Sequence, residues 1–155
     1  MTGAPAQLVD RPYGEGTWTA REVVAHLIFG EQTDWLPRLD HILAHGEAEP
    51  FCSFDRAGHK PLLRFTMDEL LDSFEVHRRD SLSALRALNL GAAELARMGR
   101  HPALGVVTVS QLLATWAVHD LNHIAQVCKA MAFGFRDEVG PWEQYLSVLA
   151  PPAPR

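Results

Sequence analysis

The sequence has little that marks a membrane, nucleic-acid-binding or disulfide-stabilised protein. Its apolar stretches, such as residues 23–29, are far shorter than the roughly 20 residues of a membrane span, and no secretion signal opens the chain. With a net charge of −5 and both signs mixed, no basic stripe could bind a phosphate backbone. Cys52 and Cys128 form no CxxC motif, which predicts reduced thiols. We therefore expect a cytoplasmic protein that binds neither membranes nor nucleic acids.

Internal repeats and low-complexity tracts are also absent, apart from a Pro-rich tail at residues 150–155. The chain has 155 residues, of which 47% are hydrophobic, and this predicts one domain over residues 1–155 with a real core. Glycines and prolines interrupt residues 1–17, so we expect an irregular segment there.

Three capping boxes predict three long helices. In each box a Thr is followed three residues later by an acid or an amide, and apolar residues flank the pair. These helices begin at Thr19, Thr66 and Thr108 and end before Gly46, Gly91 and Gly134. Pro37 should kink or split the first helix near Asp34 and Trp35, because its ring clashes with the preceding turn.

The remaining segments predict shorter elements. We expect two helical turns at residues 92–98, a helix from Pro141 to Leu149, a loop at residues 46–65 and a short strand around Val106 and Val107. No other stretch alternates as a strand does. The fold class is therefore predicted as all-α, a helical bundle with long crossover loops.

Two histidines lie four residues apart on the third predicted helix. His119 and His123 differ by about 40° around a helix, so both imidazoles can reach one metal ion. The run HDLNH is similar to the HExxH motif of zinc proteases, but Asp120 stands where the motif has its general base, which argues against a protease. Both histidines belong to an apolar stripe that should face the core: Leu112, Trp116, His119, His123, Val127 and Ala130.

A third histidine, His26, interrupts the apolar run of the first helix and should also point inward. Three imidazoles from two helices would leave one coordination position open, as in catalytic zinc sites. The alternative is a metal-free core in which the histidines hydrogen-bond one another. The other histidines are expected near the surface: His41, His45, His59, His77 and His101.

Three segments together resemble the DinB superfamily, the metal-binding four-helix bundles that include thiol S-transferases and relatives of the mycothiol-dependent maleylpyruvate isomerase. They are residues 18–27 followed by Trp35, residues 108–113 and residues 119–126. By this resemblance, His26, His119 and His123 match the three metal ligands of the family. It implies a divalent metal, Zn²⁺ or Ni²⁺ first, and a low-molecular-weight thiol as a possible co-substrate.

One departure from the family concerns its first bundle helix, which looks missing or stunted here. Only 18 residues precede Thr19, and several are Gly or Pro. A bundle that lacks one helix exposes the apolar surface which that helix would cover, unless a second subunit or the predicted Pro141–Leu149 helix covers it. We therefore predict a homodimer.

The resemblance predicts a metal-dependent enzyme of thiol S-transferase or hydrolase type that acts on a small molecule. The alternative is a stress-related bundle in which the ion is only structural. Trp35 and Trp116 could line a pocket, although aromatic residues on such stripes are more often core. Asp120 and Glu31 are the nearest candidates for handling protons, but we expect a solvated helix face to explain both.

Overall fold

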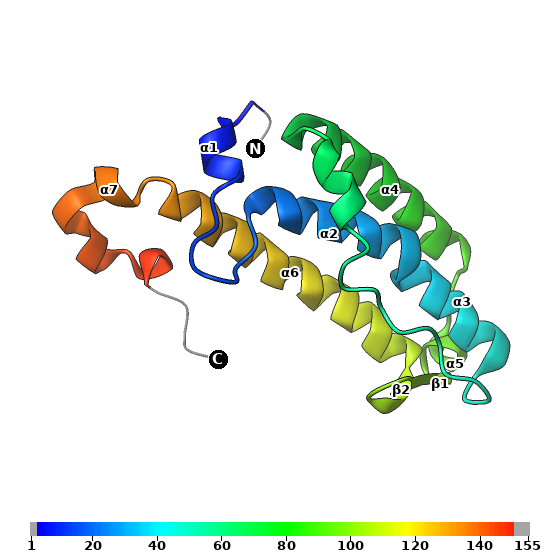
Figure 1. Ribbon diagram of the computed structural model, residues 1–155. Helices are drawn as coiled ribbons and strands as arrows, with labels where there is room; N and C mark the ends of the chain where they lie inside the picture. Colours follow the sequence, from blue (N-terminus) through cyan, green and yellow to red (C-terminus); the bar gives the residue numbers. More distant parts are fainter. Residues whose placement is uncertain (1–2, 151–155) are drawn as a thin grey trace.

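The computed structural model describes residues 3–150, and its long helices follow the three capping boxes (Figure 1). Each Thr side chain accepts a hydrogen bond from the backbone N–H three residues on, and the side chain at that position accepts one in return. The three long helices predicted from the capping boxes are thus confirmed, with the first divided in two. They are α2 (Ala20–Thr33), α3 (Trp35–His45), α4 (Met67–Ala87) and α6 (Val109–Phe133).

The split between α2 and α3 falls at Asp34, where the prediction placed it. Pro37 is the third residue of α3, and a proline there cannot continue the hydrogen-bond ladder of α2. Asp34 bridges the two helices, because its N–H donates to the Gly30 carbonyl while its own carbonyl accepts from the N–H of Arg38.

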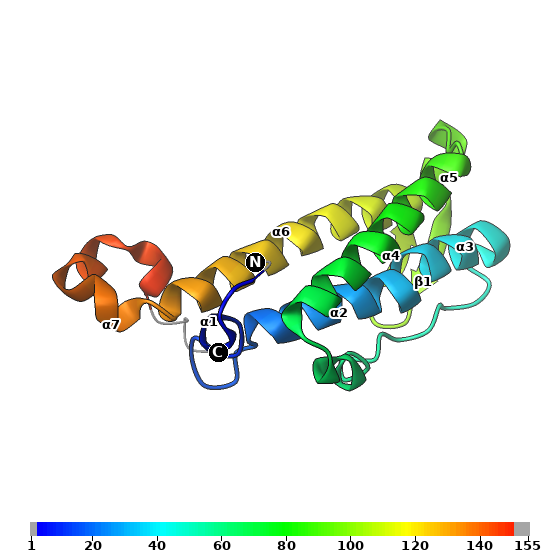
Figure 2. The ribbon, with the colours of Figure 1, turned by 90° about the horizontal axis from the view of Figure 1, so that it is seen from above.

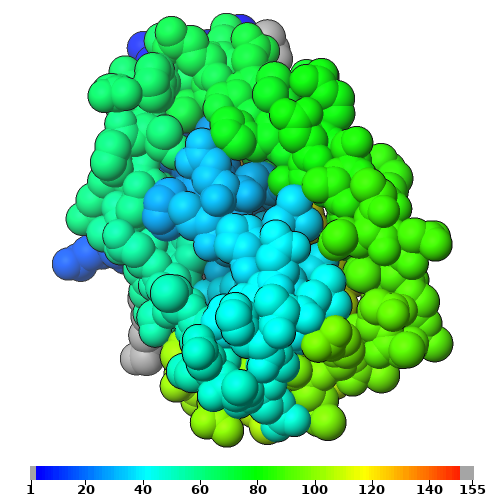
Figure 3. Space-filling model, turned by 90° about the vertical axis from the view of Figure 1, so that its right-hand side faces the viewer, coloured from blue at the N-terminus to red at the C-terminus, as the bar shows by residue number. Residues whose placement is uncertain are grey.

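Helix α2 lies between α4 and α6, and α3 continues from it towards one end of the molecule. Figures 1 and 2 show α4 along one side of α2 and α6 along another. The face in Figure 3 shows α3 between α4 and the segment of residues 50–65, which includes the 3₁₀ helix η1 (Lys60–Arg64). Apolar residues of α2, including Val23 and Ile28, are fully buried, so α2 forms the core against which the other helices pack.

A short hairpin precedes α6. The strands β1 (Met98–His101) and β2 (Gly105–Thr108) pair antiparallel, and Gly105, the first residue of β2, adopts φ +79° directly after the turn. The strand expected around Val106 and Val107 is confirmed. The two helical turns expected at residues 92–98 shrink to α5 (Ala92–Leu95), because Met98 pairs with Thr108 in the hairpin.

The segment before α2 contains a single helical turn among its described residues, α1 (Ala6–Val9). It packs near the far end of α6, where Leu8 lies so close to Gly134 that a Cβ there would come within 2.4 Å of Leu8 Cδ2. Figure 1 shows that α1 covers only one end of α6.

The C-terminal segment corrects one prediction. Instead of an α-helix from Pro141 to Leu149, it forms α7 (Arg136–Val139) and two 3₁₀ turns, η2 (Gly140–Tyr145) and η3 (Ser147–Leu149). Leu146 takes an extended ψ of 86° between the two turns, which interrupts any continuous helix. Residues 151–155 of the predicted Pro-rich tail lie outside the described residues. None of the helices in residues 3–150 combines the length and apolar character needed to cross a bilayer.

Candidate metal site

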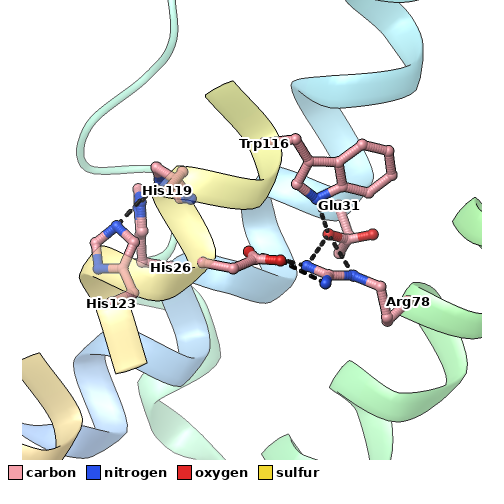
Figure 4. Close-up of polar contacts among 7 residues, drawn as sticks. His26, Glu31, Arg78, Trp116, His119 and His123 are labelled. Atoms are coloured by element: carbon pink, nitrogen blue, oxygen red, sulfur yellow. Dashed lines mark hydrogen bonds and ion pairs between the residues drawn. The ribbon is translucent and has the colours of Figure 1, made fainter. Parts of the chain in front are cut away.

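The structure brings the three predicted ligands together where α2 and α6 pack side by side. His26 lies on α2 and His119 and His123 on α6, and their rings converge in Figure 4. The Nε2 atom of His119 is 3.1 Å from Nε2 of His26 and 3.0 Å from Nε2 of His123. One ligand atom from each ring lies within 4.8 Å of the other two, a separation that a single ion can bridge.

The hydrogen bond of His123 and the close approach of the three Nε2 atoms suit a cation better than a hydrogen-bonded cluster. Nδ1 of His123 lies 2.6 Å from Gln126 Oε1, so this nitrogen carries the proton and Nε2 carries the lone pair. A single N–H on His119 Nε2 cannot point directly at both neighbouring rings. An ion that accepts three lone pairs would satisfy all three Nε2 atoms at once, so the donor set fits a divalent metal.

Burial keeps these imidazoles neutral. Desolvation, and then the neighbouring histidines, lower the pKa of His26 from 6.5 to about 3. Burial likewise lowers the pKa of His119 to about 4 and shifts the pKa of His123 in the same direction. The unprotonated form is the one that binds metals, so at neutral pH no proton must leave before an ion binds.

Two cavities open on the histidines from different sides. A cavity of about 450 Å³ reaches His26 and His119 between α3, the hairpin and α6. A second, of about 590 Å³, reaches His26 and His123 beside Trp18 and the N-terminal segment. Both volumes fall in the range of small-molecule sites. Of the two tryptophans considered as pocket residues, Trp35 lines the first cavity, whereas Trp116 lines neither, and both are buried in the core.

His59 corrects the prediction of a surface residue. Its exposed fraction is only 2%, and its ring packs 5.0 Å from the Trp18 ring and 5.9 Å from the His26 ring, measured between centroids. Residues 46–65 have no helical or strand periodicity, so the sequence offered no signal that this loop folds back over α2.

An ion-pair network links α4 to both helices that carry the histidines. Arg78 of α4 donates to Glu31 Oε1 through Nε at 3.1 Å and Nη2 at 2.8 Å, and its Nη1 lies 2.5 Å from Asp120 Oδ2. Trp116 Nε1 also donates to Glu31 Oε1, at 3.1 Å. Figure 4 shows Arg78, Glu31 and Trp116 beside the histidine cluster.

The network corrects the expectation that Glu31 and Asp120 lie on a solvated face. The side chain of Glu31 is completely buried, and that of Asp120 is only 19% exposed and paired with Arg78. Sequence analysis missed Arg78 as their partner. The available signal was Glu31 itself, since an acid among buried residues of α2 requires a cation nearby.

Comparison with known proteins agrees with this architecture. The sequence profile of the DinB superfamily matches residues 1–127. The chain belongs to the DinB superfamily. All three clustered histidines lie within the residues that the DinB profile matches. No curated protein matches the chain.

Among solved structures, the chain is similar to YfiT from Bacillus subtilis, which is described as a probable metal-dependent hydrolase with an unusual four-helix bundle topology. The two share 24% sequence identity, and the match covers 88% of this chain and 75% of YfiT with a TM-score of 0.63. This likeness shows the fold, a DinB-like four-helix bundle, and so confirms the predicted fold class.

Proposed function

We propose that this DinB-superfamily protein is a metal-dependent enzyme of the hydrolase or thiol S-transferase type, with a divalent ion on His26, His119 and His123. The observation that carries the proposal is the convergence of three neutral Nε2 atoms at a point that two cavities reach. Such an ion supplies Lewis acidity, which polarises a substrate carbonyl or lowers the pKa of water or a thiol. Zn²⁺ and Ni²⁺ suit an all-imidazole site.

The protein's own residues hold the imidazoles in place and leave the site open. Gln126 sets the tautomer of His123, and Arg78 holds the two ligand-bearing helices through Glu31 and Asp120. Because the cavities meet the cluster on different sides, a substrate and a low-molecular-weight thiol could approach it separately. The description of YfiT as a probable hydrolase supports the hydrolase branch.

The principal alternative is a non-catalytic, stress-related bundle in which the ion only joins α2 to α6. A structural site is usually closed by a fourth protein ligand, whereas the cluster within residues 3–150 contains three. The open cavities therefore favour the enzyme.

Metal analysis of the purified protein tests the proposal. We expect about one divalent ion per chain in the wild type and loss of that ion in His123→Ala. His41→Ala is a matched control, because His41 and His45 also lie four residues apart on a helix but outside the cluster. Absence of metal from the wild type, even after incubation with Zn²⁺ or Ni²⁺, would contradict the proposal.

Activity assays then distinguish a hydrolase from a thiol S-transferase, and either enzyme from the non-catalytic alternative. The metal-loaded and chelated proteins are compared in ester and amide hydrolysis and in transfer of a thiol to an electrophile. Metal-dependent turnover in one assay assigns the reaction type, while bound metal without turnover in either supports the structural alternative.

We also propose a homodimer that forms through the outer face of α6. On this face Val118, Leu121 and Ile124 are 63%, 65% and 54% exposed, and neither α1 nor the C-terminal segment covers them. The face carries no charge and repeats as a coiled-coil seam does, so a second copy related by a two-fold axis would complement it. Its residues are Ala114, Ala117, Val118, Leu121, Ile124, Ala125 and Cys128.

A further inference from the structure

The smaller cavity beside the histidines has two chemically different ends. One end reaches His26 and His119, and the walls beyond them are mainly apolar, with Trp35, Phe51 and Phe54 among their residues. The other polar groups include two arginines, and the only carboxylate in the lining is Asp34. The apolar walls thus suit an elongated, largely apolar ligand. The charged residues of the lining determine which chemical group the ligand carries at the end away from the histidines.

Arg38 is the best-placed cation in this cavity. Its Nε lies 2.5 Å from Asp34 Oδ1, its guanidinium carbon lies 4.9 Å from the centroid of the Phe51 ring, and its side chain is only 13% exposed. Within residues 3–150, neither Nη group of Arg38 makes a hydrogen bond. A largely desolvated guanidinium therefore keeps a pair of donors, the geometry that a carboxylate matches.

His101 supplies a further donor beside the same aromatic ring. Its Nδ1 accepts hydrogen bonds from the backbone N–H groups of Ala103 at 3.0 Å and Leu104 at 3.1 Å, which places the ring proton on Nε2. The His101 ring meets Phe51 edge-on at 5.3 Å between centroids. Burial, and then the charge of Arg38, lower the pKa of His101, so the ring is neutral and donates from Nε2 at neutral pH.

We propose that the substrate of this site is a small monocarboxylate with an apolar body. Its carboxylate would bind Arg38 and His101, with Arg56 adding positive charge at the cavity wall, while its reacting end lies at the three histidines. A dianionic phosphate fits less well, because Asp34 already neutralises part of the Arg38 charge and would repel a second negative charge. The position of the reacting end rests on the proposed function, whereas the carboxylate subsite does not require the metal.

Binding of a matched pair of probes to the chelated protein tests the subsite. The probes are 3-phenylpropionate and its neutral amide, 3-phenylpropanamide, measured by calorimetry or ligand-observed NMR in the presence of EDTA. We expect the acid to bind about tenfold more tightly than the amide, a difference of about 1.4 kcal/mol, because the amide lacks the negative charge that would pair with Arg38. Arg38→Met should remove this preference and Arg56→Met should reduce it about two- to threefold.

Arg79→Met is the matched control, because it deletes the same charge at an exposed position of α4 and should leave the preference unchanged. Arg38→Lys keeps Asp34 paired if Arg38→Met proves unstable, and it should still lose most of the preference because lysine lacks the paired donors. Equal binding of acid and amide would overturn the proposal, as would tighter binding of 2-phenylethyl phosphate. The carboxylate subsite would also be overturned if the acid bound only in the presence of the metal and bound equally well to Arg38→Met. The proposed enzyme function could still hold in that case.

Discussion

The two faces of α6 are both rich in apolar residues, but one is buried in the protein and the other is exposed to solvent. The inner face carries His119 and His123 among its apolar residues and is buried against α2. The outer face carries no charged residue and is exposed along Val118, Leu121 and Ile124. Buried polar groups need partners, and exposed apolar groups need a cover. We therefore propose a bound cation as the partner of the buried histidines on the inner face and a second subunit as the cover of the outer face.

The largest expected effect comes from breaking the ion pairs beside the inner face. Arg78→Met leaves the buried Glu31 without its cation, and we expect a loss of about 3 to 5 kcal/mol in the free energy of unfolding. Urea denaturation of the chelated protein measures this change in the free energy of unfolding. Arg79→Met, next to it but exposed, should change stability by less than about 0.5 kcal/mol. Similar stability of the two variants would show that the network does not support α6.

Acid titration probes the inner face through its histidines. In the metal-free protein, unfolded histidines bind protons below pH 6.5, whereas folded His26 does so only near pH 3. Stability should therefore be highest above pH 6.5 and fall as the pH drops towards 3, by on the order of 3 kcal/mol. Thermal melts across this range should show a shallower dependence of stability on pH for His26→Gln than for the wild type. An identical slope in wild type and His26→Gln would contradict the assignment.

A charge on the outer face should separate the subunits without harming the inner face. In Leu121→Glu the two copies would bring like charges together in an apolar interface, so we expect the dimer dissociation constant to rise about 100-fold. Light scattering or analytical ultracentrifugation measures the mass, and metal content should stay unchanged. Val76→Glu, an exposed apolar position on α4, is the control and should remain dimeric. A monomeric wild type at micromolar concentration would refute the dimer.

The smallest effect should come from the group that orients His123. Gln126→Leu removes the acceptor of the Nδ1 hydrogen bond but keeps the size of the side chain. We expect metal affinity to fall about tenfold, with the fold retained. Competition with a chromogenic chelator measures the affinity, and Gln144→Leu in the exposed C-terminal turn should match the wild type.

Much of this fold could be predicted because its signals are local. Each capping box lies within four residues, and the clash of Pro37 involves only the preceding turn, so the limits of α2, α3, α4 and α6 follow from short segments. The inward direction of the α6 histidines also follows from helical period. The C-terminal segment was predicted wrongly as a helix, because Pro141 suits the start of a 3₁₀ turn as well as that of an α-helix.

The sequence by itself therefore determined the three capped helices and the inward direction of His26, His119 and His123 on them. Only the tertiary structure decided which groups far apart in the chain come together. The ring of His59 packs against that of His26, and Arg78 pairs with both Glu31 and Asp120. Arg38 and His101 line the same cavity. The physical reason is the distance along the chain over which each kind of interaction acts. Helix formation depends on neighbours one turn apart, whereas the pairing of buried charges and the shape of a cavity depend on how segments far apart in the chain pack together.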